Sequence, residues 1–159
     1  TIIIDSGSTT AELVKNLPDL ENLTVITNAL NIANLIGNSN NITMIMLGGY
    51  FRKNSLSLVG PLAEKSMRNF NVDKVFLGVD GFDTKQGIFT PNIEESRLGE
   101  LMIGIAKEVI VLVDSSKFKK RSLALICKIN LIHKVITDSN ISEEDRKRLE
   151  DAGVEVIIA

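Results

Sequence analysis

Cysteine and histidine are nearly missing from this sequence of 159 residues, since each occurs once. With Cys127 as its only cysteine, the chain cannot form an internal disulfide, which fits a reducing compartment and predicts a cytoplasmic protein. Cys127 stands in the apolar stretch LALICKI, where a free cysteine is typically a small core residue. The single histidine, His133, gives no basis for a Ser-His-Asp arrangement or a metal centre, so we expect no metal and no cofactor.

Long apolar runs, a cleavable leader and an excess of basic residues are also missing. No apolar stretch approaches the ~20 residues that a helix needs to cross a bilayer, and no signal-peptide pattern is present, so we expect no membrane contact. The net charge of −2 argues against a nucleic-acid surface on this chain. The one basic run, Lys117 to Arg121, is typical of a solvated loop. Because Thr1 begins inside a predicted strand, we expect one domain of a longer protein.

The sequence repeats a pattern of apolar strand, polar loop and helix. Apolar strands are predicted at residues 1–4, 23–27, 42–47, 74–80, 109–114, 123–129, 133–138 and 154–158. Helices are predicted at residues 11–17, 29–37, 60–70, 94–106 and 142–153, with Pro18 ending the first, Pro61 as a first helical residue and Ser142 as a cap. The strands are continuously apolar, which indicates burial on both faces. Residues 1–159 are therefore predicted to form one α/β domain, with a parallel or mixed sheet and helices on both faces.

Small, acidic or hydrogen-bonding residues follow almost every predicted strand. They are Asp5 to Thr10, Thr27-Asn28, Gly48-Gly49, Asp80-Gly81, Asp114 to Lys117 and Thr137-Asp138. In an open α/β sheet, ligands bind outside the carboxyl ends of the strands, so these loops are expected to converge on one cleft. Each loop also has a purely structural interpretation, because asparagine at position 28 is a normal helix cap and paired glycines commonly turn a chain.

The first loop, DSGSTT, has the chemistry of a phosphate cradle. Gly7 lets the backbone approach a ligand closely, and a helix starting near Thr10 offers unpaired N–H groups and a positive dipole end. The hydroxyls of Ser6, Ser8, Thr9 and Thr10 are further donors. The loop matches neither GxxxxGK[ST] nor GxGxxG, so a compact phosphate on a small molecule fits better than a nucleotide. The alternative is a capping box, in which Thr9 and Glu12 bond the free amides of the helix start.

The remaining loops suit a polyhydroxylated ligand. Asp80 and Asp114 can accept hydrogen bonds from sugar hydroxyls, and Lys117 offers a positive charge to phosphate or carbonyl oxygen. The same residue types also suit a sugar-phosphate isomerase. In that reading Asp80 or Asp114 is the general base and Lys117 stabilises the enediolate.

Several motifs in this order resemble the C-terminal sensor domain of DeoR-family bacterial transcriptional regulators. They are DSGSTTAELVKNL, TVITNALNIANLI, MLGGYFRKNSLSLVGP, DKVFLGVDGFDTKQGIFT, VIVLVDSSKF and HKVITDSNISEEDRKRLEDAGVEVIIA. The resemblance implies a fold similar to ribose-5-phosphate isomerase (Rossmann-like) and an effector-binding domain for a phosphorylated sugar or related intermediate. It also implies that operator DNA is bound only through an N-terminal winged helix-turn-helix of the full-length protein.

The resemblance also implies roles for individual residues. Phosphate binding falls to Gly7, Ser8, Thr9 and Thr10. The rest of the effector pocket falls to Asp5, Ser6, Thr27, Asn28, Gly48, Gly49, Asp80, Gly81 and Lys117. One departure concerns Gly99, which stands where many relatives have lysine in a helix and which brings no charge.

The leading interpretation is a sensor without catalysis, in a regulator expected to act as a repressor. Such operator readers usually need two-fold symmetry, so a homo-oligomer is expected. The alternatives are the isomerase and a vestigial cleft in a domain that only assembles subunits. The sequence leaves open which sugar is bound and what its binding does to repression.

Overall fold

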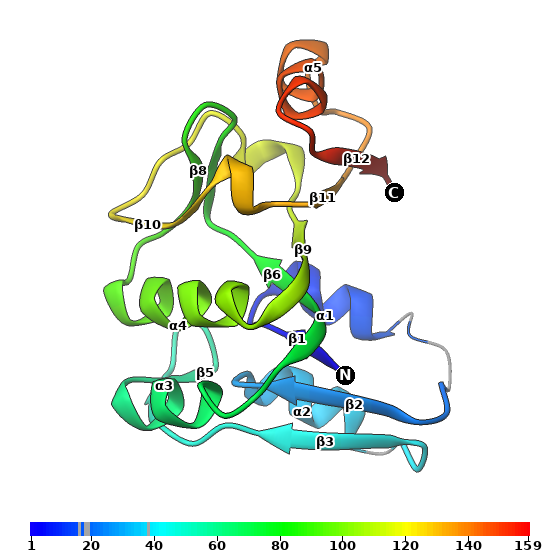
Figure 1. Ribbon diagram of the computed structural model, residues 1–159, viewed down its shortest axis with the longest axis vertical. Coiled ribbons are helices and arrows are strands. Elements are labelled where there is room, and N and C mark those ends of the chain that lie inside the picture. The colour runs from blue at the N-terminus through cyan, green and yellow to red at the C-terminus, as the bar shows by residue number, and fades with distance from the viewer. Residues whose placement is uncertain (16, 18–19, 38) are drawn as a thin grey trace.

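The computed structural model describes residues 1–15, 17, 20–37 and 39–159; the predicted helix end at Pro18 lies outside them. A seven-stranded sheet forms the centre of the fold (Figure 1). Its strands are β1 (Ile2–Ile4), β2 (Leu23–Thr27), β3 (Ile42–Met46), β6 (Val72–Gly78), β9 (Ala106–Leu112), β11 (Lys134–Thr137) and β12 (Glu155–Ile158). They lie in the order β12-β11-β9-β6-β1-β2-β3, and every neighbouring pair is parallel. The α/β prediction is confirmed, with a main sheet that is purely parallel.

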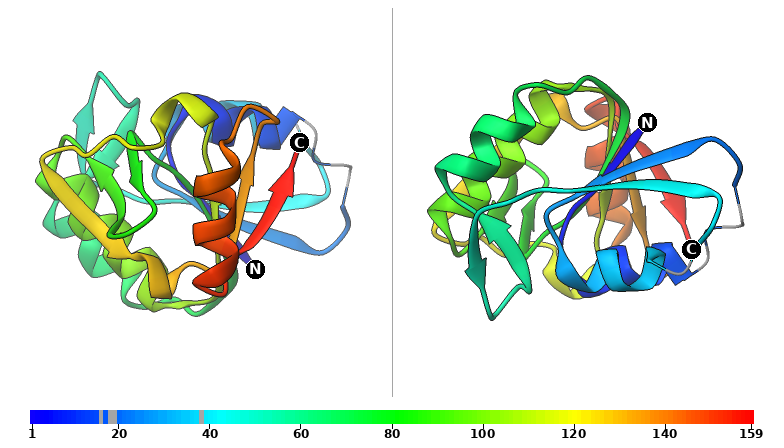
Figure 2. Two further views of the ribbon diagram at one scale, coloured as in Figure 1. Left: turned by 90° about the horizontal axis from the view of Figure 1, so that it is seen from above. Right: turned by 90° about the horizontal axis from the view of Figure 1, so that it is seen from below.

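Helices cover both faces of this sheet, as predicted (Figure 2). They are α1 (Ser8–Lys15), α2 (Leu30–Ile36), α3 (Pro61–Met67), α4 (Ile93–Gly104) and α5 (Glu143–Asp151). Pro61 is the first residue of α3, and the Ser142 side chain caps α5 by accepting the Asp145 N–H at 3.1 Å. Both details match the sequence prediction.

Two apolar cores result from the alternation of side chains along the strands. Ile2 and Ile4 point toward α1 and α2, where they pack in one cluster. Ile3 points the other way and joins the cluster that contains residues of α3, α4 and α5. Ile3 and Ile4 are both fully buried, and burying an isoleucine side chain contributes about 1.5–3 kcal/mol. The run of isoleucines that opens the chain therefore serves both cores.

Two small antiparallel sheets extend from the main sheet. Of their strands, only the one at residues 124–128 lies in a predicted strand, and the others lie in segments that were predicted to be loops. β4 (Tyr50–Arg52) pairs with β5 (Ser57–Val59) in a hairpin, and β8 (Gly87–Thr90) lies between β7 (Gly81–Asp83) and β10 (Ala124–Lys128). Two 3₁₀ turns complete the fold, η1 (Ser115–Lys117) and η2 (Ile129–Leu131). Most of these strands have only three or four residues, so their sequences carry little periodic signal.

The strand order reverses between β1 and β6. The chain moves from β1 through α1 to β2 on one side, and from β6 through α4 to β9 on the other. Loops that leave adjacent strands toward opposite faces of a sheet open a crevice at the carboxyl edge. At this point the two loops touch, because a Cβ at Gly78 would lie 2.9 Å from the Ser6 carbonyl oxygen. A side chain at position 78 would push the first loop away from the sheet.

The stacked pair Phe82–Phe118 attaches the segment that contains η1 to the small three-stranded sheet. The ring centroids are 5.1 Å apart with an interplanar angle of 13°, and Phe82 is fully buried. We expect Phe82→Ala to lower the free energy of unfolding by about 3–5 kcal/mol in urea titrations, because it leaves a cavity and removes the stack. Leu123→Ala is the control, since Leu123 is 75% exposed and its loss should cost less than about 0.5 kcal/mol. Equal effects of the two substitutions would contradict this assignment.

Candidate functional site

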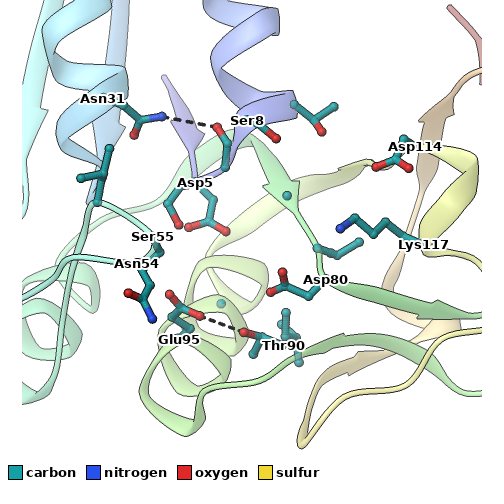
Figure 3. A pocket seen from close by; sticks show the side chains of 18 residues that line it. Asp5, Ser8, Asn31, Asn54, Ser55, Asp80, Thr90, Glu95, Asp114 and Lys117 are labelled. Carbon is teal, nitrogen blue, oxygen red and sulfur yellow. Dashed lines mark hydrogen bonds between the residues drawn. The ribbon is translucent and has the colours of Figure 1, made fainter.

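A cavity of about 430 Å³ opens at the switch point between β1 and β6 (Figure 3). Many of the polar residues singled out in the sequence line it: Asp5, Ser6, Gly7, Ser8, Thr9, Asp80, Asp114 and Lys117. They come from the ends of β1, β6 and β9, so the predicted convergence of loops occurs at three neighbouring strands. The cavity is large enough for a small organic molecule.

The loop after β1 is held in one conformation by the carbonyl of Gly7. This oxygen accepts the Ala11 N–H at 3.2 Å, the Thr10 hydroxyl at 3.0 Å and the Asn31 side-chain amide at 3.4 Å. Gly7 itself has φ +144°, a backbone conformation that residues with a side chain rarely adopt. The first amides of α1, on Ser8, Thr9 and Thr10, have no partner within the helix and carry the positive end of its dipole. These free amides are groups of the kind that bind anions at helix starts.

The capping-box alternative does not fit the observed start of the helix. A capping box places threonine just before the helix, whereas α1 begins at Ser8 and Thr9 is its second residue. Thr9 lines the cavity, and Glu12 forms an ion pair with Lys15 at 2.5 Å.

Besides Asp114, the carboxylates of Asp5, Asp80 and Glu95 line the cavity (Figure 3). Glu95 accepts the Thr90 hydroxyl at 2.8 Å and forms an ion pair at 3.3 Å with Arg52 of the hairpin β4–β5. Burial, together with the negative charges of Glu95 and Asp80, raises the pKa of Asp5 to about 7, although hydrogen bonds from Ser6 lower it. Asp5 is consequently a carboxyl group that changes charge near neutral pH.

Lys117 reaches the cavity from η1, the turn that follows β9. The Asp114 side chain caps this turn by accepting the Ser116 N–H at 3.0 Å, and Asp138 accepts the Ser115 N–H at 2.6 Å. Asp138 also accepts the Asn140 N–H at 2.9 Å, and the two backbone hydrogen bonds lower the pKa of Asp138 to about 2. Asp138 thus positions the turn and does not line the cavity.

The neighbouring basic residues point elsewhere. Lys119 forms ion pairs with Glu144 at 3.5 Å and Asp145 at 3.6 Å, and Arg121 pairs with Asp83 at 2.6 Å. Within the described part of the chain, Lys117 forms no ion pair, and its amino group extends toward the cavity (Figure 3). The basic run therefore divides into one cavity-lining lysine and residues that tie the loop to the rest of the fold.

Two predicted polar ligands are instead buried parts of the scaffold. Thr10 and Thr27 are fully buried, and their hydroxyls donate to the carbonyls of Gly7 and Ile4 at 3.0 and 2.7 Å. Neither side chain lines the cavity, because those hydroxyls fix the loops from behind, and phosphate binding by Thr10 stays a prediction that rests on its backbone N–H.

Asn28 does not line this cavity, and the interpretation of Asn28 as a helix cap is wrong. It is 2% exposed and donates to the Leu58 carbonyl at 3.3 Å, while Ala29 is the residue that precedes α2. The hairpin takes over the capping role, since the Leu56 carbonyl accepts the Leu30 N–H at 2.8 Å.

Gly48, Gly49 and Gly81 do not line this cavity, and each lies close to a neighbouring segment instead. A Cβ at Gly49, whose φ is +146°, would lie 2.5 Å from the Val59 carbonyl oxygen, so this glycine permits the hairpin. A Cβ at Gly81 would lie 2.7 Å from the Lys120 carbonyl oxygen, and one at Gly48 would contact the Leu62 side chain at 3.3 Å.

Several lining residues were not predicted from the sequence; they come from α2, the hairpin β4–β5, the end of β6, β8, α4 and β10. The missed lining residues are Asn31, Asn54, Ser55, Leu56, Gly78, Val79, Thr90, Glu95 and Ile126. One signal was available for Glu95, because Asn92 caps α4 by accepting the Glu95 N–H at 2.9 Å, and this places Glu95 in the first turn. The hairpin residues follow no buried strand of the main sheet, so nothing in their sequence linked them to the other loops.

Gly99 lies in α4 and lines the cavity. A Cβ at this position would lie 2.8 Å from the Ile126 side chain of β10. Its lack of a side chain thus lets α4 and β10 approach each other at the cavity wall.

Metal binding and membrane insertion find no support in the described residues. Within ranges 1–15, 17, 20–37 and 39–159, no three acidic, histidine or cysteine side chains are grouped so that they could hold a metal ion. None of the helices described there is long and apolar enough to cross a membrane.

Comparison with known proteins gives a consistent family match. The model described as the DeoR C terminal sensor domain matches residues 1–139. The chain is 39% identical over 155 residues to the uncharacterized HTH-type transcriptional regulator YulB of Bacillus subtilis, covering 98% of this chain and 60% of that protein. It is 35% identical to the HTH-type transcriptional regulator GolR of Listeria innocua, covering 100% and 63%. It is 31% identical to the HTH-type transcriptional repressor GlcR of Bacillus subtilis, covering 99% and 60%. The chain spans about three fifths of the length of these relatives.

Solved structures with a similar fold have low sequence identity to this chain. eIF2B beta from Chaetomium thermophilum matches with a TM-score of 0.52 and 18% identity, over 84% of this chain and 42% of that one. Ribose 5-phosphate isomerase from Plasmodium falciparum matches with a TM-score of 0.49 and 16% identity, over 74% and 44%. The first of these similarities concerns the fold alone.

The raised pKa of Asp5 predicts a pH-dependent stability. Because the folded-state pKa of about 7 exceeds the ordinary value of 3.8, the contribution of Asp5 to the free energy of unfolding falls as pH rises from about 4 to about 7. Asp5→Asn removes this penalty, so at pH 8 the variant should be about 2–4 kcal/mol more stable than wild type, with the gain shrinking toward pH 4.

Thermal unfolding at a series of pH values measures this effect. Asp73→Asn is the matched control, because its hydrogen bond to Lys107 lowers the pKa of Asp73 to about 2, and its loss should not stabilise the fold at any pH. A gain in stability for Asp5→Asn that is the same at pH 4 and pH 8 would contradict the assignment.

Proposed function

Because the chain belongs to the DeoR C-terminal sensor domain family, we propose that it is the ligand-sensing part of a transcriptional regulator of sugar metabolism. Its effector is a phosphorylated sugar or a related intermediate, bound in the cavity between β1 and β6. The observation that carries this proposal is the anion cradle formed by the loop after β1 and the start of α1, with Lys117 lining the same cavity.

The polar groups around the cradle support a ligand with several hydroxyls. Asp80 accepts hydroxyl donors, while the side chains of Asn54 and Ser55 supply an amide and a hydroxyl from the hairpin. The phosphate lies against the amides of Ser8 and Thr9, and the carbon skeleton extends toward Asp80 and Glu95.

The proposed sensing depends on the fact that several separate elements form the wall of the cavity. The cavity wall contains the loop after β1, the end of β6, the hairpin β4–β5, α4 and η1. A ligand that contacts all of them favours the conformation in which they close around it, and it shifts the population toward that conformation. The Arg52–Glu95 ion pair joins the hairpin to α4 and couples the two to the bound ligand.

The full regulator acts as a repressor, as GlcR is named, and contacts operator DNA through a winged helix-turn-helix outside these 159 residues. The net charge of −2 supports a chain that does not itself bind DNA. Two-fold operator symmetry favours a homo-oligomer.

A sugar-phosphate isomerase is the second candidate, because a carboxylate and a lysine line the same cavity. Asp114 suits a general base poorly, since its carboxylate accepts both the N–H and the hydroxyl of Ser116. Asp80 accepts no hydrogen bond at its carboxylate within the described residues, so the isomerase reading rests on Asp80 and Lys117.

The phosphate cradle is tested by placing a negative charge in it. Gly7→Val is unsuitable because φ +144° at this position would strain the backbone of any variant. Ser8→Asp is better, since an acidic residue at a helix start stabilises the helix by about 0.3–1 kcal/mol while repelling a bound phosphate. We expect it to weaken binding of glucose 6-phosphate or inorganic phosphate by at least about tenfold in calorimetric titrations.

Ser8→Asn is the matched control, because it is neutral and should bind within about threefold of wild type. If a well-folded Ser8→Asp variant binds phosphate as tightly as wild type, the assignment of the phosphate to this loop is contradicted.

Turnover should be absent. Ribose 5-phosphate and glucose 6-phosphate incubated with the chain are expected to remain unchanged when followed by NMR, beyond the rate in buffer. If the wild-type chain isomerises a sugar phosphate and Asp80→Asn abolishes that activity, the isomerase proposal replaces the sensor proposal.

A further inference from the structure

A second hollow lies in the surface beside helix α4. It has a volume of about 740 Å³ and is lined by residues of α4, β9, β10 and the turn η2, together with His133. Strand β10 runs next to α4 (Figure 1), and we call this hollow the α4–β10 groove. It is a different site from the cavity at the β1–β6 switch point, although Ile126 of β10 lines both.

The α4–β10 groove has an apolar floor and exposed leucines along it. Ile103 of α4, Val109 of β9 and Ile126 of β10 are buried in its floor, each at most 8% exposed. Leu125 and Leu131 also line it, and they are 41% and 47% exposed. Large apolar side chains that stay in contact with water around a hollow mark a surface that another molecule covers.

A small-molecule site explains this groove poorly. Such sites combine apolar walls with a few buried polar groups that converge on the ligand. Here every polar residue that lines the groove is exposed: Glu100, Lys128, Asn130 and His133. The Nδ1 atom of His133 already accepts the Val109 N–H at 3.0 Å. An apolar centre with a polar, exposed rim is instead the anatomy of a protein–protein interface.

The charges of the groove indicate which protein fits it. Glu100 belongs to α4 and Lys128 is the last residue of β10, so the two charges come from different walls. Neither forms an ion pair within the described part of the chain. In a two-fold dimer the same patch meets itself, so each contact between two different residues forms twice. One acidic and one basic residue around an apolar centre suit that symmetry, because each can pair with the opposite charge of the other copy.

Gly104, the last residue of α4, leaves room in the groove for a side chain of the other copy. It lines the groove and is exposed. A Cβ at this position would meet no neighbouring segment of the described residues within 4 Å. The space beside Gly104 can therefore be filled without disturbing the chain itself.

We propose that the α4–β10 groove is the two-fold interface between two copies of this chain, with Leu131 of each copy beside Gly104 of the other and Glu100 paired with Lys128 across the axis. The inference rests on the proposed function only in expecting a homo-oligomer, whose contact surface it assigns. The interface adjoins the cavity at the switch point, because Ile126 lines both and a Cβ at Gly99 would lie 2.8 Å from its side chain. Assembly and effector binding thus act on one wall, formed by α4 and β10.

Charge reversal tests the pairing across the axis. Glu100→Lys and Lys128→Glu should each raise the dimer dissociation constant of the chain at least about tenfold in sedimentation equilibrium, because each creates two like-charge contacts per dimer. The double variant restores both pairs and should return to within about threefold of wild type. Both residues are exposed, so the reversals leave the core intact.

Filling the groove tests its apolar centre. Gly104→Met should raise the dissociation constant at least about tenfold without lowering the thermal stability of the monomer, since methionine is a better helix former than glycine. Gly104→Ala is the matched control, because it changes helix propensity with little added volume and should stay within about threefold of wild type. Leu131→Asp should also weaken the dimer, whereas Leu35→Asp should not, since Leu35 is 39% exposed on α2 and packs with the other core.

The outcomes for this interface are independent of ligand titrations. A wild-type chain that stays monomeric up to about 200 µM assigns the groove to a different protein and overturns the proposal, while the effector proposal stands. Dimers that persist unchanged in the single reversals and in Gly104→Met lie on another surface, which also overturns it. Single reversals that weaken the dimer without recovery in the double variant overturn the pairing of Glu100 with Lys128.

Discussion

The site depends on the contact between the loop after β1 and the end of β6. These strands are parallel neighbours at the point where the sheet order reverses, and their loops leave toward opposite faces. Gly78 has no side chain, so the Ser6 carbonyl can lie against the strand, and the next carbonyl, that of Gly7, is fixed by three donors. This arrangement directs the first amides of α1 into the crevice, and the remaining walls are placed around them.

The second constraint is electrostatic. Asp5 lies where the helix dipole favours negative charge, yet burial and the neighbouring carboxylates of Glu95 and Asp80 raise its pKa to about 7. Carboxylates that face a cavity instead of pairing with protein cations are costly in the free state, because their charge is only partly solvated. A ligand that brings complementary charge removes this cost.

The hairpin β4–β5 and helix α4 show how remote segments complete the site. The hairpin turn carries Asn54 and Ser55 to the cavity, its Leu56 carbonyl binds the first amide of α2, and its Arg52 pairs with Glu95. These contacts tie one wall of the cavity to helices on both faces of the sheet. These contacts are the route through which the proposed sensing would link the hairpin to α2 and α4.

Local sequence patterns were enough to predict an α/β domain with a parallel or mixed sheet, and to predict that several polar loops meet at one edge of it. Continuous apolar strands require helices on both faces, and parallel strands bring Asp5, Asp80 and Lys117 to one edge of the sheet. The tertiary structure alone decided which polar residues face the cavity. Thr10, Thr27 and Asn28 are buried because backbone groups nearby needed their hydrogen bonds, while Glu95 and the hairpin enter through pairings between segments distant in the chain. Local sequence patterns reflect the secondary structure that neighbouring residues prefer. The hydrogen-bond partner of a buried polar group, in contrast, depends on which distant segments the fold places next to it.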